Sequence, residues 1–154
     1  MEKTLILLKP DALQRGLIGE ILHRFEIKGL KIVGLKMMSV SDALVDEHYA
    51  HHKDKPFFET LKAFMQSSPV VALAVEGADA VSTVRKMAGV TKAREAEFGT
   101  IRGDFAMSVQ ANLIHVSEDN KIASDELQRF FKAEEIFDYQ RPFDVNIYGE
   151  EERN

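Results

Sequence analysis

The chain of 154 residues contains no cysteine. Disulfide bonds and thiolate metal sites are therefore excluded. The chain also lacks any apolar run close to the roughly 20 residues that a membrane-spanning helix needs. The apolar run Leu5–Leu8 is too short for the hydrophobic region of a signal peptide, and no small-residue cleavage site follows it. Together these absences predict a cytoplasmic protein with no membrane association.

Positive charge is in the minority: 25 acidic residues outnumber 20 lysines and arginines, for a formal net charge of -5. Broad nucleic-acid binding needs a basic face that displaces counterions from phosphates, so we expect no specific nucleic-acid partner. A small anionic ligand is compatible with this balance. A few cations converging in one cleft can bind a triphosphate on an acidic protein.

The sequence has no internal repeat, no low-complexity tract and no linker rich in proline, glycine and serine. Its 45% hydrophobic and 29% charged residues suit one buried core with a charged surface. Its length also falls within the usual size of one domain. We therefore expect a single domain over residues 1–154, in which Glu150–Asn154 form a polar tail.

Hydrophobic periodicity predicts alternating strands and helices. The predicted strands are Thr4–Lys9, Leu30–Val40, Val70–Val75 and Leu113–Val116. The predicted helices are Leu17–Phe25 with Gly29 as its stop, Asp42–His52, Pro56–Ser67, Asp79–Ala88 with Asp79 as its cap and Gly89 as its stop, and Asp119–Phe131. This order favours an α+β fold of ferredoxin type, βαββαβ, with an antiparallel sheet covered by helices. A doubly wound parallel sheet is the alternative, but no glycine-rich phosphate loop follows the first strand.

Three segments hold the residue types that phosphoryl transfer uses, namely cations and a nucleophile. They are Lys9-Pro10-Asp11, Gly99–Phe105, and Asn112–His115 followed by Ser117 and Glu126. Taken alone, a histidine is more often structural than nucleophilic. A neutral imidazole is nevertheless a good nucleophile near pH 7, and the arginine fork matches phosphate oxygens. The candidate nucleophile is His115, and the candidate cations are Lys9, Arg85 and Arg102.

In these three segments the chain resembles the nucleoside diphosphate kinase family, and the resemblance runs from Leu5 to about Tyr139. It includes the segments Gln14–Leu17, Pro56–Phe58 and Ser68–Val71. The resemblance implies an enzyme that passes the γ-phosphate of a nucleoside triphosphate to a nucleoside diphosphate by a ping-pong mechanism. It implies a phosphohistidine at His115, formed by attack through Nδ1. It also implies Mg²⁺, held mainly by the nucleotide phosphates and not by protein side chains.

The same resemblance assigns roles to the remaining site residues. Glu126 would hold the other imidazole nitrogen, and Ser117 would help to place that glutamate. Tyr49 would lie near His115 and Lys9, whereas Phe57 would stack on the base with Leu61 beside it. The residues that would contact phosphates and ribose are Lys9, Arg85, Thr91, Arg102 and Asn112.

The chain departs from the family pattern at several positions. Val116 follows the histidine where glycine or alanine is common, Glu118 replaces an aspartate, and Gln110-Ala111 replaces a frequent Gly-Arg pair. The loop Lys92–Phe98 lacks the usual proline turns. Because that loop contributes subunit contacts in the family, which forms hexamers or tetramers, we expect a homo-hexamer with one weakened interface and a tetramer as the alternative.

Two further hypotheses concern binding without catalysis. A non-catalytic nucleotide-binding module of the same fold would be favoured by loss of Lys9, Arg102, Asn112 or His115, and all four are present.

The histidines His48, His51 and His52 have i, i+3, i+4 spacing, which places them on one helix face. Such a face can bind zinc. We favour solvated polar residues here because no carboxylate or cysteine completes a site.

Overall fold

A computed structural model of the chain describes residues 1–152 and places four strands in one sheet, in the order β2-β3-β1-β4. The strands are β1 (Glu2–Leu8), β2 (Lys31–Met38), β3 (Val70–Gly77) and β4 (Ile114–Val116). The α-helices are α1 (Pro10–Gln14), α2 (Ile18–Lys28), α3 (Asp42–His48), α4 (Phe58–Gln66), α5 (Ala80–Ala88), α6 (Ile101–Phe105) and α7 (Asn120–Phe130). The 3-10 helices are η1 (Ala50–His52), η2 (Ala93–Glu95), η3 (Ala133–Glu135), η4 (Asp144–Asn146) and η5 (Glu150–Glu152).

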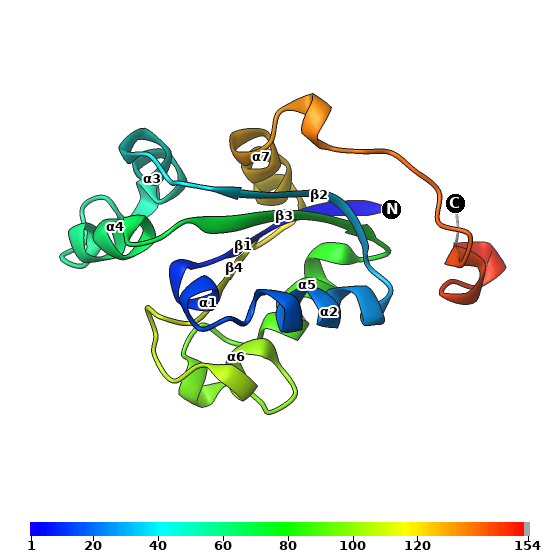
Figure 1. Cartoon of the computed structure of the whole chain (residues 1–154), viewed down its shortest axis with the longest axis horizontal. Coiled ribbons are helices and arrows are strands. Elements are labelled where there is room, and N and C mark those ends of the chain that lie inside the picture. Colours follow the sequence, from blue (N-terminus) through cyan, green and yellow to red (C-terminus); the bar gives the residue numbers. More distant parts are fainter. Residues whose placement is uncertain (153–154) are drawn as a thin grey trace.

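The strand pairings confirm the predicted ferredoxin-like fold. Strand β1 pairs antiparallel with β3 along its whole length and antiparallel with β4, and β2 pairs antiparallel with β3. The doubly wound parallel sheet is therefore excluded. Strand β1 lies in the interior of the sheet (Figure 1). The register sets Leu7 opposite His115, so the candidate nucleophile sits on an edge strand next to the buried end of β1.

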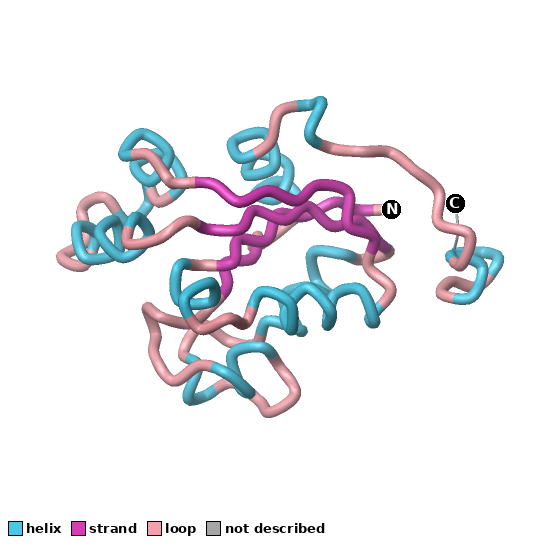
Figure 2. Tube along the Cα trace, viewed as in Figure 1, coloured by secondary structure: helices cyan, strands magenta, loops and turns pink. Residues whose placement is uncertain are grey.

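Helices cover both faces of the sheet, with α2 and α5 on one face and α7 on the other (Figures 1 and 2). Successive side chains of a strand point to opposite faces. Accordingly, Leu5 and Leu7 share a core with Phe130 of α7, whereas Ile6 and Leu8 belong to the core beneath α2 and α5. Because both faces are buried, the central strands carry unbroken apolar runs, Leu5–Leu8 in β1 and Val70–Val75 in β3, and do not alternate with polar residues.

The ends of the predicted helices are largely confirmed, with two errors. The helix predicted over Asp42–His52 ends at His48, and the 3-10 helix η1 follows it. Helix α2 ends at Gly29, whose φ of 100° is the left-handed value that glycine adopts freely. The Asp119 carboxylate accepts the N–H of Ile122 and caps α7. The prediction that Asp79 caps α5 is wrong. Its own backbone is left-handed, with φ of 48°, where a cap residue needs an extended backbone, and its side chain makes no cap hydrogen bond.

Two short helices were missed because five residues are too few to show a period. Helix α1 begins at Pro10, directly after the strand that ends beside Lys9. Helix α6 begins after Thr100, whose hydroxyl oxygen accepts the N–H of Gly103, and it carries Arg102. The motif Lys9-Pro10-Asp11 is thus the junction between strand β1 and helix α1. The motif Gly99–Phe105 is the junction between a loop and helix α6.

The predicted polar tail is exposed where the structure describes it, as the 3-10 helix η5, while Arg153 and Asn154 lie outside the described residues. None of the helices within residues 1–152 is long and apolar enough to cross a membrane.

Candidate active site

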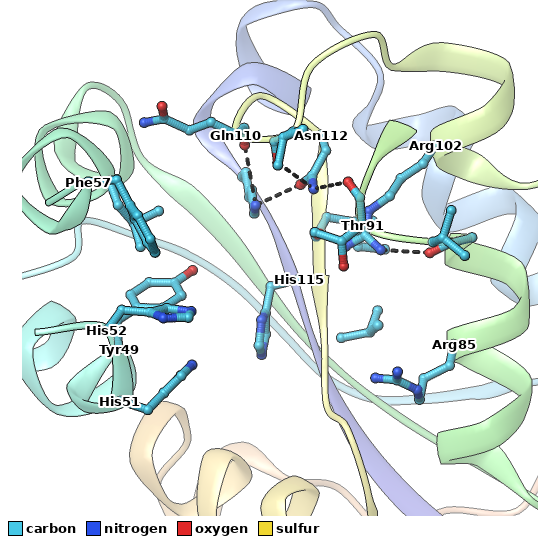
Figure 3. Close-up of a pocket in the computed structure, with 17 residues that line it drawn as sticks. Tyr49, His51, His52, Phe57, Arg85, Thr91, Arg102, Gln110, Asn112 and His115 are labelled. Atoms are coloured by element: carbon cyan, nitrogen blue, oxygen red, sulfur yellow. Dashed lines mark hydrogen bonds between the residues drawn. The ribbon is translucent and has the colours of Figure 1, made fainter. Parts of the chain in front are cut away.

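A cleft of about 790 Å³ opens between the α3–α4 region and the segment from α5 to α6, beside the β4 strand (Figure 3). His115 projects into its centre, with Phe57 on one wall and Arg85 on the other. The structure brings together all the predicted cleft residues, which are Lys9, Tyr49, Phe57, Leu61, Arg85, Thr91, Arg102, Asn112 and His115. Ser117 and Glu126 lie behind His115 and reach it through hydrogen bonds.

The His115 ring is fixed by a chain of hydrogen bonds. Its Nε2 lies 2.8 Å from Glu126 Oε1, and the hydroxyl of Ser117 donates to Glu126 Oε2 at 2.6 Å. Burial of Glu126 opposes its ionisation, but the bonds from His115 and Ser117 outweigh burial and lower the pKa of the carboxyl. An ionised carboxylate assigns the proton to Nε2 of the neutral ring. Nδ1 is therefore left with its lone pair free.

A second histidine packs against the first. His48 is 6% exposed at the end of α3, and its ring centroid lies 4.5 Å from that of His115 at nearly a right angle. Its Nδ1 lies 3.4 Å from Arg129 Nη1 and 3.7 Å from Glu126 Oε1. Burial above all, and then the neighbouring positive groups, lower the pKa of His48 to about 2. His48 is therefore a neutral wall of the nucleophile's pocket.

The expectation that His48, His51 and His52 are solvated polar residues is wrong for His48, which is buried. His51 and His52 line the cleft, with ring centroids 3.9 Å apart. A 3-10 turn after α3 breaks the helical spacing that suggested one shared face. The donor atoms that do lie within 4.8 Å of one another belong to His48, His115 and Glu126, and all three make the contacts described above.

Two of the three cations in the cleft, Lys9 and Arg102, are buried, and Arg85 is exposed; all three have few counter-charges. Burial, then the charge of Arg102, lower the pKa of Lys9 to about 8, and Asp11 offsets this only in part. Burial and then the charge of Arg85 lower the pKa of Arg102 to about 10. Within the part of the chain described, no carboxylate oxygen lies within 4.0 Å of a charged nitrogen of Lys9, Arg85 or Arg102. Such a cluster favours a polyanion, which would relieve the repulsion.

These cations are held by backbone carbonyls and one amide. Arg102 donates to the carbonyl oxygens of Gly89 and Ile114, at 2.7 and 2.6 Å. Lys9 Nζ donates to Asn112 Oδ1 at 2.7 Å. The Asn112 amide nitrogen in turn donates to the carbonyls of Thr91 and Val109. Asn112 is only 1% exposed, so it organises the loops around the cleft as well as lining it.

Two adjacent phenylalanines near the apolar rim of the cleft differ in their exposure. Phe58 is a core residue at 4% exposed, whereas Phe57 is 49% exposed with its ring on the cleft wall, where Leu61 also lies. Val109, which the sequence did not single out, is 54% exposed and lines the same cleft. A flat aromatic ring with aliphatic neighbours suits stacking on a planar base. Tyr49 is nearly buried, and its ring centroid lies 6.4 Å from that of His115.

The structure shows where two of the departures from the family pattern lie in the fold. Val116 lines the cleft yet packs against the core beneath α2 and α5, so its bulk is accommodated away from the imidazole. The loop Lys92–Phe98 contains η2 and ends on a phenylalanine that is 91% exposed. The unusual loop therefore changes the outer surface and leaves the cleft residues in place.

A ferredoxin-like sheet that supports a fixed imidazole, an uncompensated cation cluster and a stacking ring defines a protein that handles nucleotide phosphates. The family model of the nucleoside diphosphate kinases matches residues 2–136. A nucleoside diphosphate kinase of Parabacteroides distasonis is 51% identical over 152 residues, which cover 99% of each chain. One of Pyrococcus abyssi is 51% identical over 146 residues, covering 93% of this chain and 92% of its own length.

Solved structures agree with these sequence relatives. The halophilic nucleoside diphosphate kinase of Halobacterium salinarum, determined in complex with CDP, superposes with a TM-score of 0.94 at 47% identity, covering 96% of this chain and 99% of that chain. The chain belongs to the nucleoside diphosphate kinase family, and its enzymatic class is that of a phosphotransferase acting on nucleotides. The resemblance in its motifs is thereby confirmed.

Proposed function

We propose that the chain transfers the γ-phosphate of a nucleoside triphosphate to a nucleoside diphosphate through a phosphohistidine at His115. The observation that carries this proposal is the hydrogen bond from Nε2 to Glu126, which leaves Nδ1 as the nucleophilic atom in a cleft of cations. In the first half-reaction the Nδ1 lone pair forms a P–N bond while the bond from phosphorus to the β,γ-bridging oxygen breaks. In the second, a terminal oxygen of the acceptor diphosphate attacks phosphorus and the P–N bond breaks.

The charge that develops in both steps is matched by groups already in the cleft. Arg85 and Arg102 present guanidinium groups to the equatorial phosphate oxygens, and Thr91 adds a hydroxyl. Lys9 and Asn112 lie at the inner end of the cleft, where ribose hydroxyls and the transferred group meet. Glu126 stays ionised and stabilises the positive charge that the imidazole gains when it is phosphorylated.

We further propose that Mg²⁺ accompanies the nucleotide. No carboxylate is present among the described residues that line the cleft, so hard oxygen ligands for the ion would come from the phosphates and water. When bound, the ion neutralises phosphate charge and orients the β- and γ-phosphoryl groups.

We propose a homo-hexamer, with a tetramer as the alternative, because two separate apolar regions are exposed. One lies on the edge strand β2, at Leu35 and Met37; the other lies on the segment after α5, at Phe98 and Met107. One self-complementary face gives a closed dimer, and larger closed assemblies need a second contact. Light scattering that gives a monomer at micromolar concentration would contradict both assignments.

A cytoplasmic location is proposed as well, since the chain has no cysteine with which to form disulfides.

The experiment that tests the catalytic proposal needs no acceptor. Purified protein mixed with Mg²⁺ and ATP labelled at its γ-phosphate should retain label that is labile in acid and stable in base. Addition of any nucleoside diphosphate should discharge the label as the corresponding triphosphate, and EDTA should prevent its formation. A protein that transfers phosphate between nucleotides without ever holding the label would refute the two-step mechanism.

A further inference from the structure

The backbone just before the nucleophile's strand has an unusual conformation. Leu113 has a φ of 71°; besides Asp79, it is the one non-glycine residue within residues 1–152 with a positive φ. The N–H of Ile114 donates to the carbonyl of Asn112 at 2.9 Å, which closes a three-residue γ-turn around Leu113. A γ-turn with positive φ at its central residue is rare and strained. The turn joins Asn112 directly to the strand that carries His115.

The segment after β1 holds both polar groups of Leu113. Its carbonyl oxygen accepts the N–H of Lys9 at 2.9 Å, and its own N–H donates to Asp11 Oδ2 at 3.0 Å. The Leu113 side chain is fully buried, so it cannot swing outwards to relieve the strain. Two hydrogen bonds from one neighbouring segment therefore hold the turn in place.

The carboxylate of Asp11 is buried although it accepts only a single N–H, and such burial costs folding free energy. Asp11 is 7% exposed, and its second oxygen, Oδ1, has no hydrogen-bond partner among residues 1–152. Burying an under-satisfied carboxylate opposes folding. An acidic residue in the first turn of a helix is often a simple helix-end charge, as α1 would allow. Here, however, the bond runs to a residue 102 positions away. The buried carboxylate thus serves the turn as well as its own helix.

We propose that Asp11 is a positioning residue for phosphoryl transfer: it holds the strained turn at Leu113 and thereby fixes the Asn112 amide and the His115 imidazole. The inference rests on the proposed phosphorylation of His115. Without Asp11 the turn can relax towards negative φ, which rotates the peptide groups on both sides of Leu113. That rotation would disturb the 2.7 Å bond between Lys9 and Asn112 and the direction of the His115 strand. Small misplacements of a reacting group cost large factors in rate.

The first test compares two substitutions at one position. Asp11→Ala removes the acceptor, whereas Asp11→Asn keeps an oxygen that can accept the N–H but loses the charge. Rapid-quench single-turnover labelling from saturating ATP should give a rate constant at least about tenfold below wild type for Asp11→Ala, with Asp11→Asn in between. Each rate is normalised to the fraction of His115 that can be phosphorylated. A folded Asp11→Ala protein that is labelled at the wild-type rate would overturn the proposal.

A matched control removes another carboxylate that accepts a backbone N–H. Glu135 Oε2 accepts the N–H of Lys132 at 2.8 Å and lies outside the cleft. Glu135→Ala should lower the melting temperature and leave the labelling rate unchanged. If Asp11→Ala behaves in the same way, with lower stability and an unchanged rate, Asp11 is structural and the proposal fails.

The second test changes the strain itself. Glycine adopts positive φ without a side-chain penalty, so in the Leu113→Gly background nothing drives the turn to relax. The loss of rate caused by Asp11→Ala should then shrink by at least about threefold; an equal loss in both backgrounds would refute a role through the turn. If the double variant does not fold, the ranking of the two Asp11 variants decides. If wild type itself takes no label, the proposed phosphohistidine fails, and not this inference.

Discussion

The two ends of the active-site cleft differ in how complete they are without a substrate. Around His115, the contacts that orient the imidazole ring are in place: Nε2 meets Glu126, and Ser117 holds the glutamate. Around Arg102, burial and neighbouring charge lower the pKa, and its Nε has no hydrogen-bond partner within residues 1–152. The nucleophile is therefore oriented in advance, whereas the cation cluster is completed only by the phosphates it binds. Substitutions at the two ends should have different signatures.

The largest effect is expected at the nucleophile. His115→Ala should lower the rate of phosphate transfer by more than about a thousandfold, because one group is the only covalent acceptor. Nucleotide affinity should change little, since many other side chains share the binding. Transfer kinetics and equilibrium binding of a nucleoside diphosphate check both statements. The exposed histidine His23 on α2 provides the control, and His23→Ala should retain full activity. Substantial transfer by a folded His115→Ala protein would contradict the assignment of His115 as the phosphorylated residue.

The cation end should show the opposite signature, with binding and transfer falling together. Arg102→Met removes a guanidinium from the phosphate site, and loss of one such preorganised donor costs on the order of a hundredfold in rate. Because Arg102 also binds the carbonyls of Gly89 and Ile114, thermal unfolding must be measured beside kcat/KM. The same substitution should relieve repulsion on Arg85. An unchanged affinity for nucleoside diphosphate would show that Arg102 does not meet phosphate.

The lowered pKa of Lys9 predicts that nucleotide affinity and stability depend on pH at the cation end of the cleft. Its pKa is lowered to about 8 from the usual 10.5 because burial and Arg102 disfavour its charge. Above pH 8 the free protein loses this charge, so the affinity for nucleoside diphosphate should fall by up to about tenfold per pH unit. Between the two pKa values the unfolded chain binds more protons than the folded one, so the free energy of unfolding should rise with pH there. Lys9→Met should abolish both trends; trends of equal size in that variant would contradict the assignment.

A smaller effect is expected at the rim, where Phe57 offers stacking without base-specific hydrogen bonds. Phe57→Ala should weaken nucleotide binding by roughly tenfold, because stacking on one base is worth about 1–3 kcal/mol. The wild-type specificity constants for ATP, GTP, CTP and UTP should favour purines modestly. A spread beyond about a thousandfold, roughly 4 kcal/mol, would require base contacts that a stacking ring does not provide.

The smallest effect on rate is expected at Val116. Because its half-buried side chain packs against the core, Val116→Gly should leave single-turnover phosphorylation within about tenfold of wild type. It should also lower the free energy of unfolding, because glycine raises the entropy of the unfolded chain and buried methyl groups are lost. A faster rate by more than tenfold would mean that valine crowds the nucleophile.

Much of this architecture could be predicted from the sequence because it depends on local patterns. The helical period of α2, its stop at Gly29 and the valine-rich run of β3 are each strong local signals. The conformations of Asp79 and Leu113 could not be predicted in this way. The conformation of Leu113 depends on where the segment after β1 runs, and Leu113 was expected to begin a strand when it forms a turn before one.

The same limit applies to the cleft. Motifs and family resemblance led to the residues that line it, but not to the burial of His48 or to the inward placement of His51 and His52. His48 is buried by packing against His115 and Phe130, which are distant in the sequence. The break in helix geometry after α3 places His51 and His52, and hydrophobic periodicity does not detect a short 3-10 turn. The partnership of Asp11 with a backbone group 102 positions away is likewise a property of the folded chain alone.

The central claim is that Glu126 locks one nitrogen of His115 and leaves the other to attack phosphate. The most direct measurement is to locate the phosphate on the labelled protein, by mass spectrometry for the residue and ³¹P NMR for the ring nitrogen. The claim predicts one phosphate per subunit, on Nδ1 of His115. Phosphate on Nε2 of that ring, or on His51 or His52 across the cleft, would contradict it.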